Sequence, residues 1–153
     1  MPDVFISYST QDSQMAQFIH KHLKSENISA FLAEISLVPG QSWKEEILRN
    51  LKASSWVLFL ASNAACRSAM AQQEMGVAVG TGKRIIPIVW DIDPSRLPGW
   101  LDGFQALDLR NLSLEQVKEK VSGIANQIKA DGSIGLVIAG VIILAIAVWS
   151  AKK

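Results

Sequence analysis

The sequence predicts an α/β domain in which helices cover both faces of a parallel sheet. Short apolar runs rich in β-branched and aromatic residues alternate along the chain with longer segments of helical periodicity. Turn residues border each apolar run, as expected for strands. Strands that alternate with helices form parallel sheets. The 153 residues allow one such domain and a short appendage.

The chain begins with a strand and a helix. Residues 4–8 form a short apolar run with strand-forming composition. Residues 11–25 are predicted to be a helix because Met15, Ile19 and Leu23 recur at helical spacing. These three side chains are therefore expected to face the core.

A second strand, a loop and a second helix follow. Residues 28–32 are the predicted strand, and the loop 33–41 ends in a Pro-Gly pair. Ser42 is expected to cap the next helix, because Glu45 three residues later completes a capping box. The buried face of that helix is predicted to consist of Trp43, Ile47, Leu48 and Leu51.

The second half continues the alternation. Residues 56–61 are the third strand, followed by a helix that carries Glu74. Residues 84–90 are the fourth strand and 104–109 a weaker fifth. Five such units suggest a flavodoxin-like sheet in the order 2-1-3-4-5. The last amphipathic helix is marked by Leu114, Val117, Val121, Ile124 and Ile128.

Composition excludes several classes of function. The 15 basic and 14 acidic residues are nearly balanced and form no basic stripe, so nucleic acid is not an expected partner. The single cysteine, Cys66, excludes an internal disulfide and a Cys-based zinc site, and it is expected to be a small apolar filler. His20 and His22 lie two apart on a helix and cannot form a ligand pair, so both are expected at the surface. No metal site is predicted.

The C-terminal end predicts a membrane anchor. Residues 131–133, Asp-Gly-Ser, are expected to break the last helix and to end a domain of residues 1–130. The uncharged stretch 132–151 would span about 30 Å as a helix, the hydrocarbon thickness of a bilayer. Residues 134–151 are therefore predicted to cross the membrane, with residues 152–153 as a basic tail. The N-terminus shows no signal peptide, so residues 1–130 are expected to face the cytoplasm.

Glu74 is the only charged side chain between Arg67 and Lys83. Alanine, methionine and valine surround it on a helix that is expected to be mostly packed. A carboxylate in such a setting is either a solvated surface group or a group held for chemistry, and the residues alone leave both readings open.

The predicted strand order places a crevice at the end of the first strand. Ligands of doubly wound sheets bind beyond the carboxyl ends of strands where the order reverses, next to Ser7, Tyr8, Ser9 and Thr10. Their hydroxyls and a helix N-terminus could hold phosphate or ribose. The alternative is that Ser9 or Thr10 only caps the first helix.

Two other nucleotide and phosphate chemistries are excluded. Residues 80–83 are similar to a P-loop, but Arg84 stands where Ser or Thr is required and the loop leads from a helix into a strand. A phosphorelay receiver needs an acidic pair after the first strand and an aspartate at the end of the third. Residues 7–9 and 61–63 contain no acid.

Several segments in a fixed order carry a family resemblance. They are Phe5-Ile6-Ser7-Tyr8-Ser9, Leu37-Val38-Pro39-Gly40, Ser62-Asn63, Ala71-Gln72-Gln73-Glu74, Pro87-Ile88-Val89-Trp90-Asp91 and Asp93-Pro94. Together, over roughly residues 3–130, they resemble the bacterial type of Toll/interleukin-1 receptor (TIR) domain. In that family the Pro-Gly pair belongs to the BB loop, which here comprises Glu34, Leu37, Val38, Pro39 and Gly40.

The resemblance implies an enzyme that cleaves NAD+ to nicotinamide and ADP-ribose or a cyclic ADP-ribose. NAD+ is then a substrate, and no cofactor is implied. Glu74 matches the family's essential glutamate, and Ser7, Tyr8, Ser9, Thr10, Met70 and Trp43 are the expected substrate-binding residues. Met70 is a departure, because enzymatic relatives often carry tryptophan four residues before the glutamate.

The resemblance also implies self-association of TIR domains, with assembly activating the enzyme. A membrane-anchored antiphage defence effector or signal generator is the favoured interpretation. The main alternative is a scaffold without catalysis that binds partner TIR domains through the BB loop. A third is an effector whose assembly gathers tail helices and disrupts the membrane.

Overall fold

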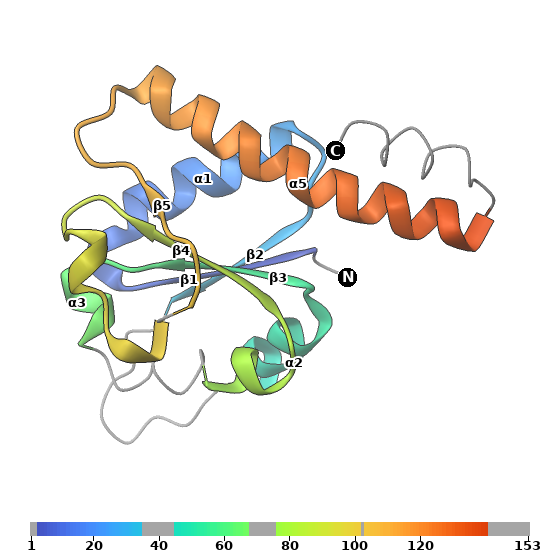
Figure 1. Cartoon of the computed structure of the whole chain (residues 1–153), viewed down its shortest axis with the longest axis horizontal. Helices are drawn as coiled ribbons and strands as arrows, with labels where there is room; N and C mark the ends of the chain where they lie inside the picture. The colour runs from blue at the N-terminus through green and yellow to red at the C-terminus, as the bar shows by residue number, and fades with distance from the viewer. Residues whose placement is uncertain (1–2, 35–44, 68–75, 102, 141–153) are drawn as a thin grey trace.

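The protein, in a computed structural model, is built on a five-stranded parallel sheet (Figure 1). The structure describes residues 3–34, 45–67, 76–101 and 103–140. The strand order is β2-β1-β3-β4-β5, which confirms the predicted order. The strands are β1 (Val4–Tyr8), β2 (Ala30–Glu34), β3 (Trp56–Leu60), β4 (Arg84–Val89) and β5 (Leu107–Asp108).

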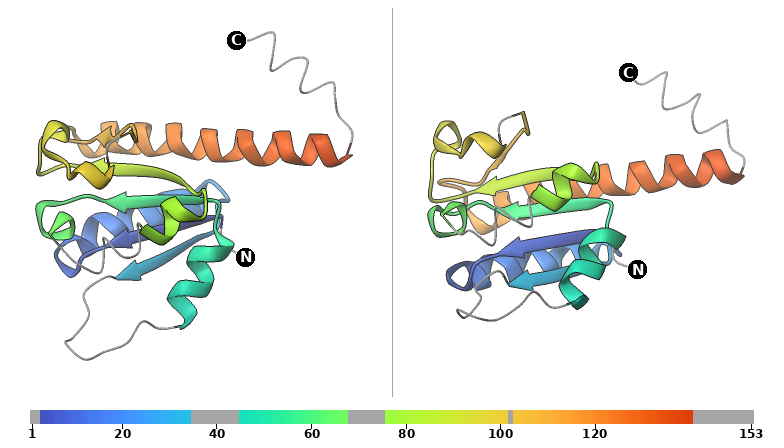
Figure 2. Two further views of the ribbon diagram at one scale, coloured as in Figure 1. Left: turned by 60° about the horizontal axis from the view of Figure 1, so that its bottom comes forward. Right: turned by 90° about the horizontal axis from the view of Figure 1, so that it is seen from below.

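Helices cover both faces of the sheet. On one face lie α1 (Ser13–Ser25) and α5 (Leu114–Gly140), and on the other lie α2 (Glu45–Ala53), α3 (Asn63–Cys66) and the helical residues 76–80 (Figure 2). Short 3-10 turns complete the described chain at η1 (Thr10–Asp12), η2 (Pro94–Arg96) and η3 (Gly99–Leu101).

Each face of the sheet has its own hydrophobic core. Successive side chains of a strand point to opposite faces, so Val4 and Ile6 join the core under α1 and α5 while Phe5 joins the core under α2 and α3. All five residues of β3 are buried, because this strand is covered from both sides.

The second and fifth strands differ from their predicted bounds. Ile28 lies in the turn that ends α1, where its N–H donates to the Leu23 carbonyl at 3.0 Å, and β2 therefore begins at Ala30. Before β5, the Phe104 N–H donates to the Leu101 carbonyl at 3.2 Å. β5 is shorter than predicted and pairs with β4 only through Leu107 and Asp108.

The last helix continues where the sequence predicts a break. α5 runs without interruption through residues 131–133 to Gly140. A single glycine in a helix costs only about 1 kcal/mol relative to alanine, which helix-forming neighbours can outweigh. Asp131 also pairs with Arg84 across a 3.0 Å contact at the start of β4.

Within the residues that the structure describes, no helix is both long enough and apolar enough to cross a membrane. Residues 141–153, which make up most of the predicted anchor and its tail, lie outside the described residues. The anchor therefore stays a prediction.

The two histidines are not the surface groups that the sequence predicts. The His20 Nε2 atom lies 3.1 Å from the Ala30 carbonyl oxygen, and the His22 Nε2 atom lies 2.7 Å from the Ser122 hydroxyl oxygen. Both side chains are half-buried because α1 is flanked by β2 on one side and α5 on the other.

Candidate functional site at the carboxyl edge of the sheet

The strand order reverses between β1 and β3, and a buried carboxylate joins the loops that follow these two strands. The Asp12 Oδ2 atom accepts hydrogen bonds from the Ser9 hydroxyl at 2.7 Å and from the Ser62 hydroxyl at 2.5 Å. Asp12 is only 7% exposed. We call Ser9, Asp12 and Ser62 the carboxylate clamp, because it ties together segments 50 residues apart in the sequence.

Local structure holds the three residues of the clamp in place. The Asp12 N–H donates to the Ser9 carbonyl at 2.8 Å and closes η1, which brings the carboxylate back toward the Ser9 hydroxyl. Ser62 is the N-cap of α3, and its hydroxyl oxygen accepts from the Ala65 N–H at 3.1 Å. The same hydroxyl donates its proton to Asp12, so both of its hydrogen-bonding functions are used.

Capping of the first helix by Ser9 is not what the structure shows. The Ser9 side chain makes no capping hydrogen bond and donates to Asp12 instead. The Thr10 hydroxyl donates to the Glu34 carboxylate at 2.7 Å, which connects the loop after β1 to the end of β2. Polar groups from the ends of three strands thus meet at one edge of the sheet.

Ser7 and Tyr8 also lie at this edge but face opposite ways. Ser7 is fully buried between Ala33 of β2 and Phe59 of β3, on the face that α2 and α3 cover. Its hydroxyl has no hydrogen-bond partner among the described residues. Tyr8 packs against the core under α1 and α5. Burial, and then the negative charge of Glu34, raise the pKa of the Tyr8 phenol.

Of the remaining predicted site residues, Glu34 lies within the described residues. Glu34 ends β2 and is exposed. The others lie outside the described residues: Glu74, Met70, Trp43, Leu37, Val38, Pro39 and Gly40.

Asp12 is the functional candidate that the sequence interpretation missed. Its only local signal is an acid four residues beyond the end of a strand, within a short polar segment. Nothing in that spacing indicates that Ser62 would supply the second hydrogen bond. The partner becomes evident only when β1 and β3 are adjacent.

Cys66 lies in the core beside this edge. Burial raises the pKa of its thiol from 9.0 to about 11, and the negative charges of Asp91 and Asp12 act in the same direction. A thiol of this kind is a poor nucleophile at neutral pH, because the thiolate is the reactive form. Within the described ranges, no group of three or more His, Cys, Asp and Glu side chains could hold a metal ion.

Comparison with solved structures shows how widely this fold occurs. The TIR domain of the Toll-related receptor TRR-2 from Hydra magnipapillata matches with a TM-score of 0.63 at 19% identity, over 84% of this chain and 99% of that one. The TIR domains of the activated Roq1 resistosome match with a TM-score of 0.61 at 18% identity, over 86% and 99%. A diflavin flavoprotein from Nostoc sp. scores 0.62 at 13% identity, over 88% and 99%. At these identities the likeness shows the fold alone.

Sequence comparison is more specific. A protein from Brachypodium distachyon, named "Probable 2' cyclic ADP-D-ribose synthase BdTIR", is 29% identical over 97 residues. The match covers 62% of this chain but only 43% of the plant protein, so this chain spans less than half of that relative's length. The sequence profile of the TIR domain matches residues 4–124. This protein therefore belongs to the TIR domain family.

Proposed function

We propose that this protein cleaves NAD+ at the bond between nicotinamide and ribose, with Glu74 as the catalytic carboxylate. The observation that carries the proposal is the similarity to a plant protein named as a probable 2' cyclic ADP-D-ribose synthase. A cyclic ADP-ribose forms from NAD+ only when that bond breaks, so the similarity supports the reaction that the resemblance to the family implies.

The geometry of the carboxyl edge supports the proposal on a second ground. The buried Ser7 hydroxyl faces the side of the sheet that α2, α3 and residues 76–80 cover, where Ala78 packs in the core. Residues 76–80 begin two positions after Glu74 in the sequence and are helical. A buried hydroxyl without a partner among the described residues can donate to an oxygen of a ribose that binds against it.

The reaction needs one carboxylate and no external acid. When the bond between nicotinamide and C1′ breaks, its electron pair goes to the ring nitrogen, and cationic nicotinamide leaves as a neutral molecule. Positive charge develops on the ribose, as in glycoside hydrolysis. The Glu74 carboxylate would offset that charge and hold the ribose hydroxyls. Water then yields ADP-ribose and a proton, whereas a hydroxyl of the same molecule yields a cyclic product and a proton.

The proposal includes activation by self-assembly at a membrane. Residues 134–151 would anchor the domain with residues 1–130 facing the cytoplasm, and BB-loop contacts would join neighbouring copies. Confinement to a surface raises the effective concentration without any new contact. A bacterial antiphage defence effector or signal generator would use such an arrangement to stay inactive until copies assemble.

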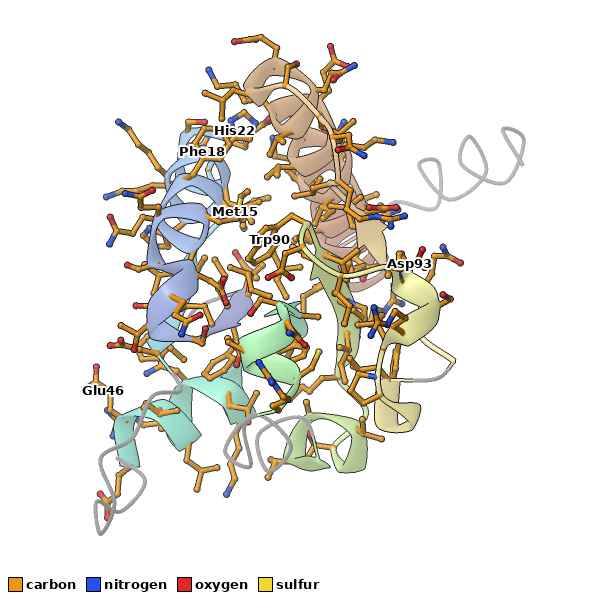
Figure 3. All side chains as sticks on the ribbon, turned by 90° about the vertical axis from the view of Figure 1, so that its left-hand side faces the viewer. Met15, Phe18, His22, Glu46, Trp90 and Asp93 are labelled. Atoms are coloured by element: carbon orange, nitrogen blue, oxygen red, sulfur yellow. The ribbon has the colours of Figure 1, made fainter. Side chains whose placement is uncertain are left out.

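The deciding experiment follows nicotinamide release from NAD+ by the purified protein, concentrated or bound to liposomes. We expect release by the parent, and a loss of at least about 100-fold in Glu74→Gln, a size typical of lost electrostatic stabilisation at a reacting centre. Glu46→Gln is the matched control, because Glu46 is an exposed acid on α2 (Figure 3). It should keep parental activity.

A scaffold without catalysis is the second candidate, because Met70 stands where enzymatic relatives often carry tryptophan. An absence of nicotinamide release by the parent under assembling conditions would refute the enzyme and favour the scaffold. Equal release by the parent and Glu74→Gln would show that another residue performs the chemistry.

A further inference from the structure

A cavity of about 400 Å³ opens on the face of the sheet opposite to Ser7. Met15 and Phe18 of α1, Trp90 after β4 and Leu114 at the start of α5 supply its apolar lining. Figure 3 shows Met15, Phe18 and Trp90 in the region between α1 and α5. The volume and the apolar, partly aromatic lining are typical of a small-molecule site.

Asp12 brings a hydrogen-bond acceptor to the wall of this cavity. Its Oδ2 atom is occupied by the two hydroxyls of the carboxylate clamp. Its Oδ1 atom accepts no hydrogen bond from any residue that the structure describes. Oδ1 is not among the buried, unpartnered side-chain atoms of the described residues, so it is accessible from the cavity, and as a carboxylate oxygen it can only accept. The cavity therefore favours a ligand that presents an N–H group to Oδ1.

The other lining residues narrow the chemistry of the ligand. Gln11 and Gln14 add amides that can both donate and accept, which suits the edge of a heterocycle. The Trp90 indole offers a flat surface for a planar ring, and Met15 and Phe18 offer apolar contacts. Since the charged group in this lining is a carboxylate, an anionic group is not expected to enter it.

We propose that this cavity binds an aminopurine ring, whose exocyclic amino group donates to Asp12 Oδ1 and whose face lies against Trp90. The site is separate from the proposed NAD+ cleavage, because it occupies the face under α1 and α5. It also explains why a buried carboxylate faces a largely apolar cavity. The ligand can be a free nucleoside or the adenine end of a larger molecule, since both present the same ring.

The first test compares adenosine with 6-methylpurine riboside, in which a methyl group replaces the amino group. Binding is measured by titration calorimetry on the full chain carrying Glu74→Gln, so that the result does not depend on NAD+ cleavage. We expect adenosine to bind at least 10-fold more tightly. The affinity for ADP-ribose then distinguishes the two possible ligands. If ADP-ribose binds more tightly than adenosine, the ligand is the adenine end of a larger molecule. If both bind equally, it is the free nucleoside.

Two variants test the position of the ligand. In Asp12→Asn the side-chain amide oxygen can still accept hydrogen bonds from Ser9 and Ser62. The amide N–H2 of the asparagine would then face the amino group of adenosine, and two donors cannot pair. Adenosine should therefore bind at least 10-fold more weakly to this variant. In Leu114→Trp a larger side chain obstructs the mouth without disturbing the core, because Leu114 is 66% exposed. Gln17→Trp is its control, since Gln17 is exposed on α1 and does not line the cavity.

Equal affinity for adenosine and 6-methylpurine riboside would overturn the proposal, as would an absence of adenosine binding. Unchanged adenosine affinity in Leu114→Trp would place the ligand elsewhere and overturn it as well. None of these outcomes depends on whether the protein releases nicotinamide, so the two proposals fail separately.

Discussion

Ser7 and Ser62 are both fully buried or nearly so, but their hydroxyls have opposite consequences for stability. The Ser7 hydroxyl has no partner among the described residues, and leaving such a group buried costs roughly 1–3 kcal/mol. We predict that Ser7→Ala raises the free energy of unfolding by about 1 kcal/mol. If the hydroxyl serves the substrate, the same change should lower kcat/KM for NAD+ about 10-fold, in line with a lost hydrogen bond of about 1.4 kcal/mol. Urea unfolding and nicotinamide release measure the two effects.

Ser62→Ala is the contrasting change at this scale. It removes the α3 cap and one of the two hydroxyls on Asp12, so we expect the free energy of unfolding to fall by about 2 kcal/mol. A destabilised Ser7→Ala variant would contradict the assignment of its hydroxyl as unsatisfied. Equal stability of Ser62→Ala and the parent would contradict the structural role of the carboxylate clamp.

At the scale of elements, α1 and α5 are joined by a polar network beside their shared core. The Ser122 hydroxyl donates to the Glu26 carboxylate at 2.8 Å and lies 2.7 Å from His22 Nε2, and Lys129 reaches the other Glu26 oxygen at 3.1 Å. The hydrogen bond from Ser122, and then that from Lys129, lower the pKa of the Glu26 carboxyl. Because folding lowers the pKa of Glu26, the ionised side chain stabilises the folded protein at pH values above its usual pKa of 4.5. This stabilisation is lost as the pH falls through the lower pKa of the folded state.

We predict that Ser122→Ala lowers the Tm at pH 7 by about 2–4 °C, as expected for one lost hydrogen bond in a domain of this size. The difference from the parent should shrink as the pH falls below 4.5, because the hydrogen bond from Ser122 is stronger to ionised Glu26 than to the protonated carboxyl. Thermal melts between pH 3 and 7 measure this. Gln127→Ala, an exposed change on the same helix, should have no effect. A pH-independent difference would show that Ser122 acts through packing alone.

At the scale of the whole molecule, the described core ends before the C-terminal segment begins. Among the residues whose side chains the structure describes, Ile128 is the last buried one of the core under α1 and α5, and the described members of both cores lie within residues 4–128. We therefore predict that removing residues 132–153 changes the free energy of unfolding by less than about 1 kcal/mol. The same truncation should weaken NAD+ depletion in cells, because the proposed anchor would no longer concentrate the domain.

Denaturant unfolding of the truncated protein and cellular NAD+ measurements test this pair of expectations. Equal activity of the truncated and full-length proteins in cells would show that the C-terminal segment plays no part in activation. A large loss of stability would show instead that residues 132–153 pack on the domain.

Local patterns were sufficient to predict three of the strands closely and the order of all five, but not the bounds of β2 and β5. Apolar periodicity and turn residues located β1, β3 and β4 to within one residue, and the alternation of strands with helices indicated the 2-1-3-4-5 order. The same patterns failed at residues 131–133, because local helix-breaking signals were weaker than the tendency of the flanking residues to continue α5. They also placed His20 and His22 at the surface, because helical spacing does not show which neighbouring elements approach a helix.

The sequence by itself determined that this protein is an α/β domain with hydroxyls at the carboxyl end of its first strand and a single acid, Glu74, on an otherwise uncharged segment. These features depend on residue type and spacing along the chain. Only the tertiary structure decided that Asp12 is shared by Ser9 and Ser62, that the Ser7 hydroxyl is buried without a described partner, and that Asp12 also lines a cavity on the other face. The physical reason is that these contacts join groups on different strands and helices, whose distances are set by the packing of the whole sheet.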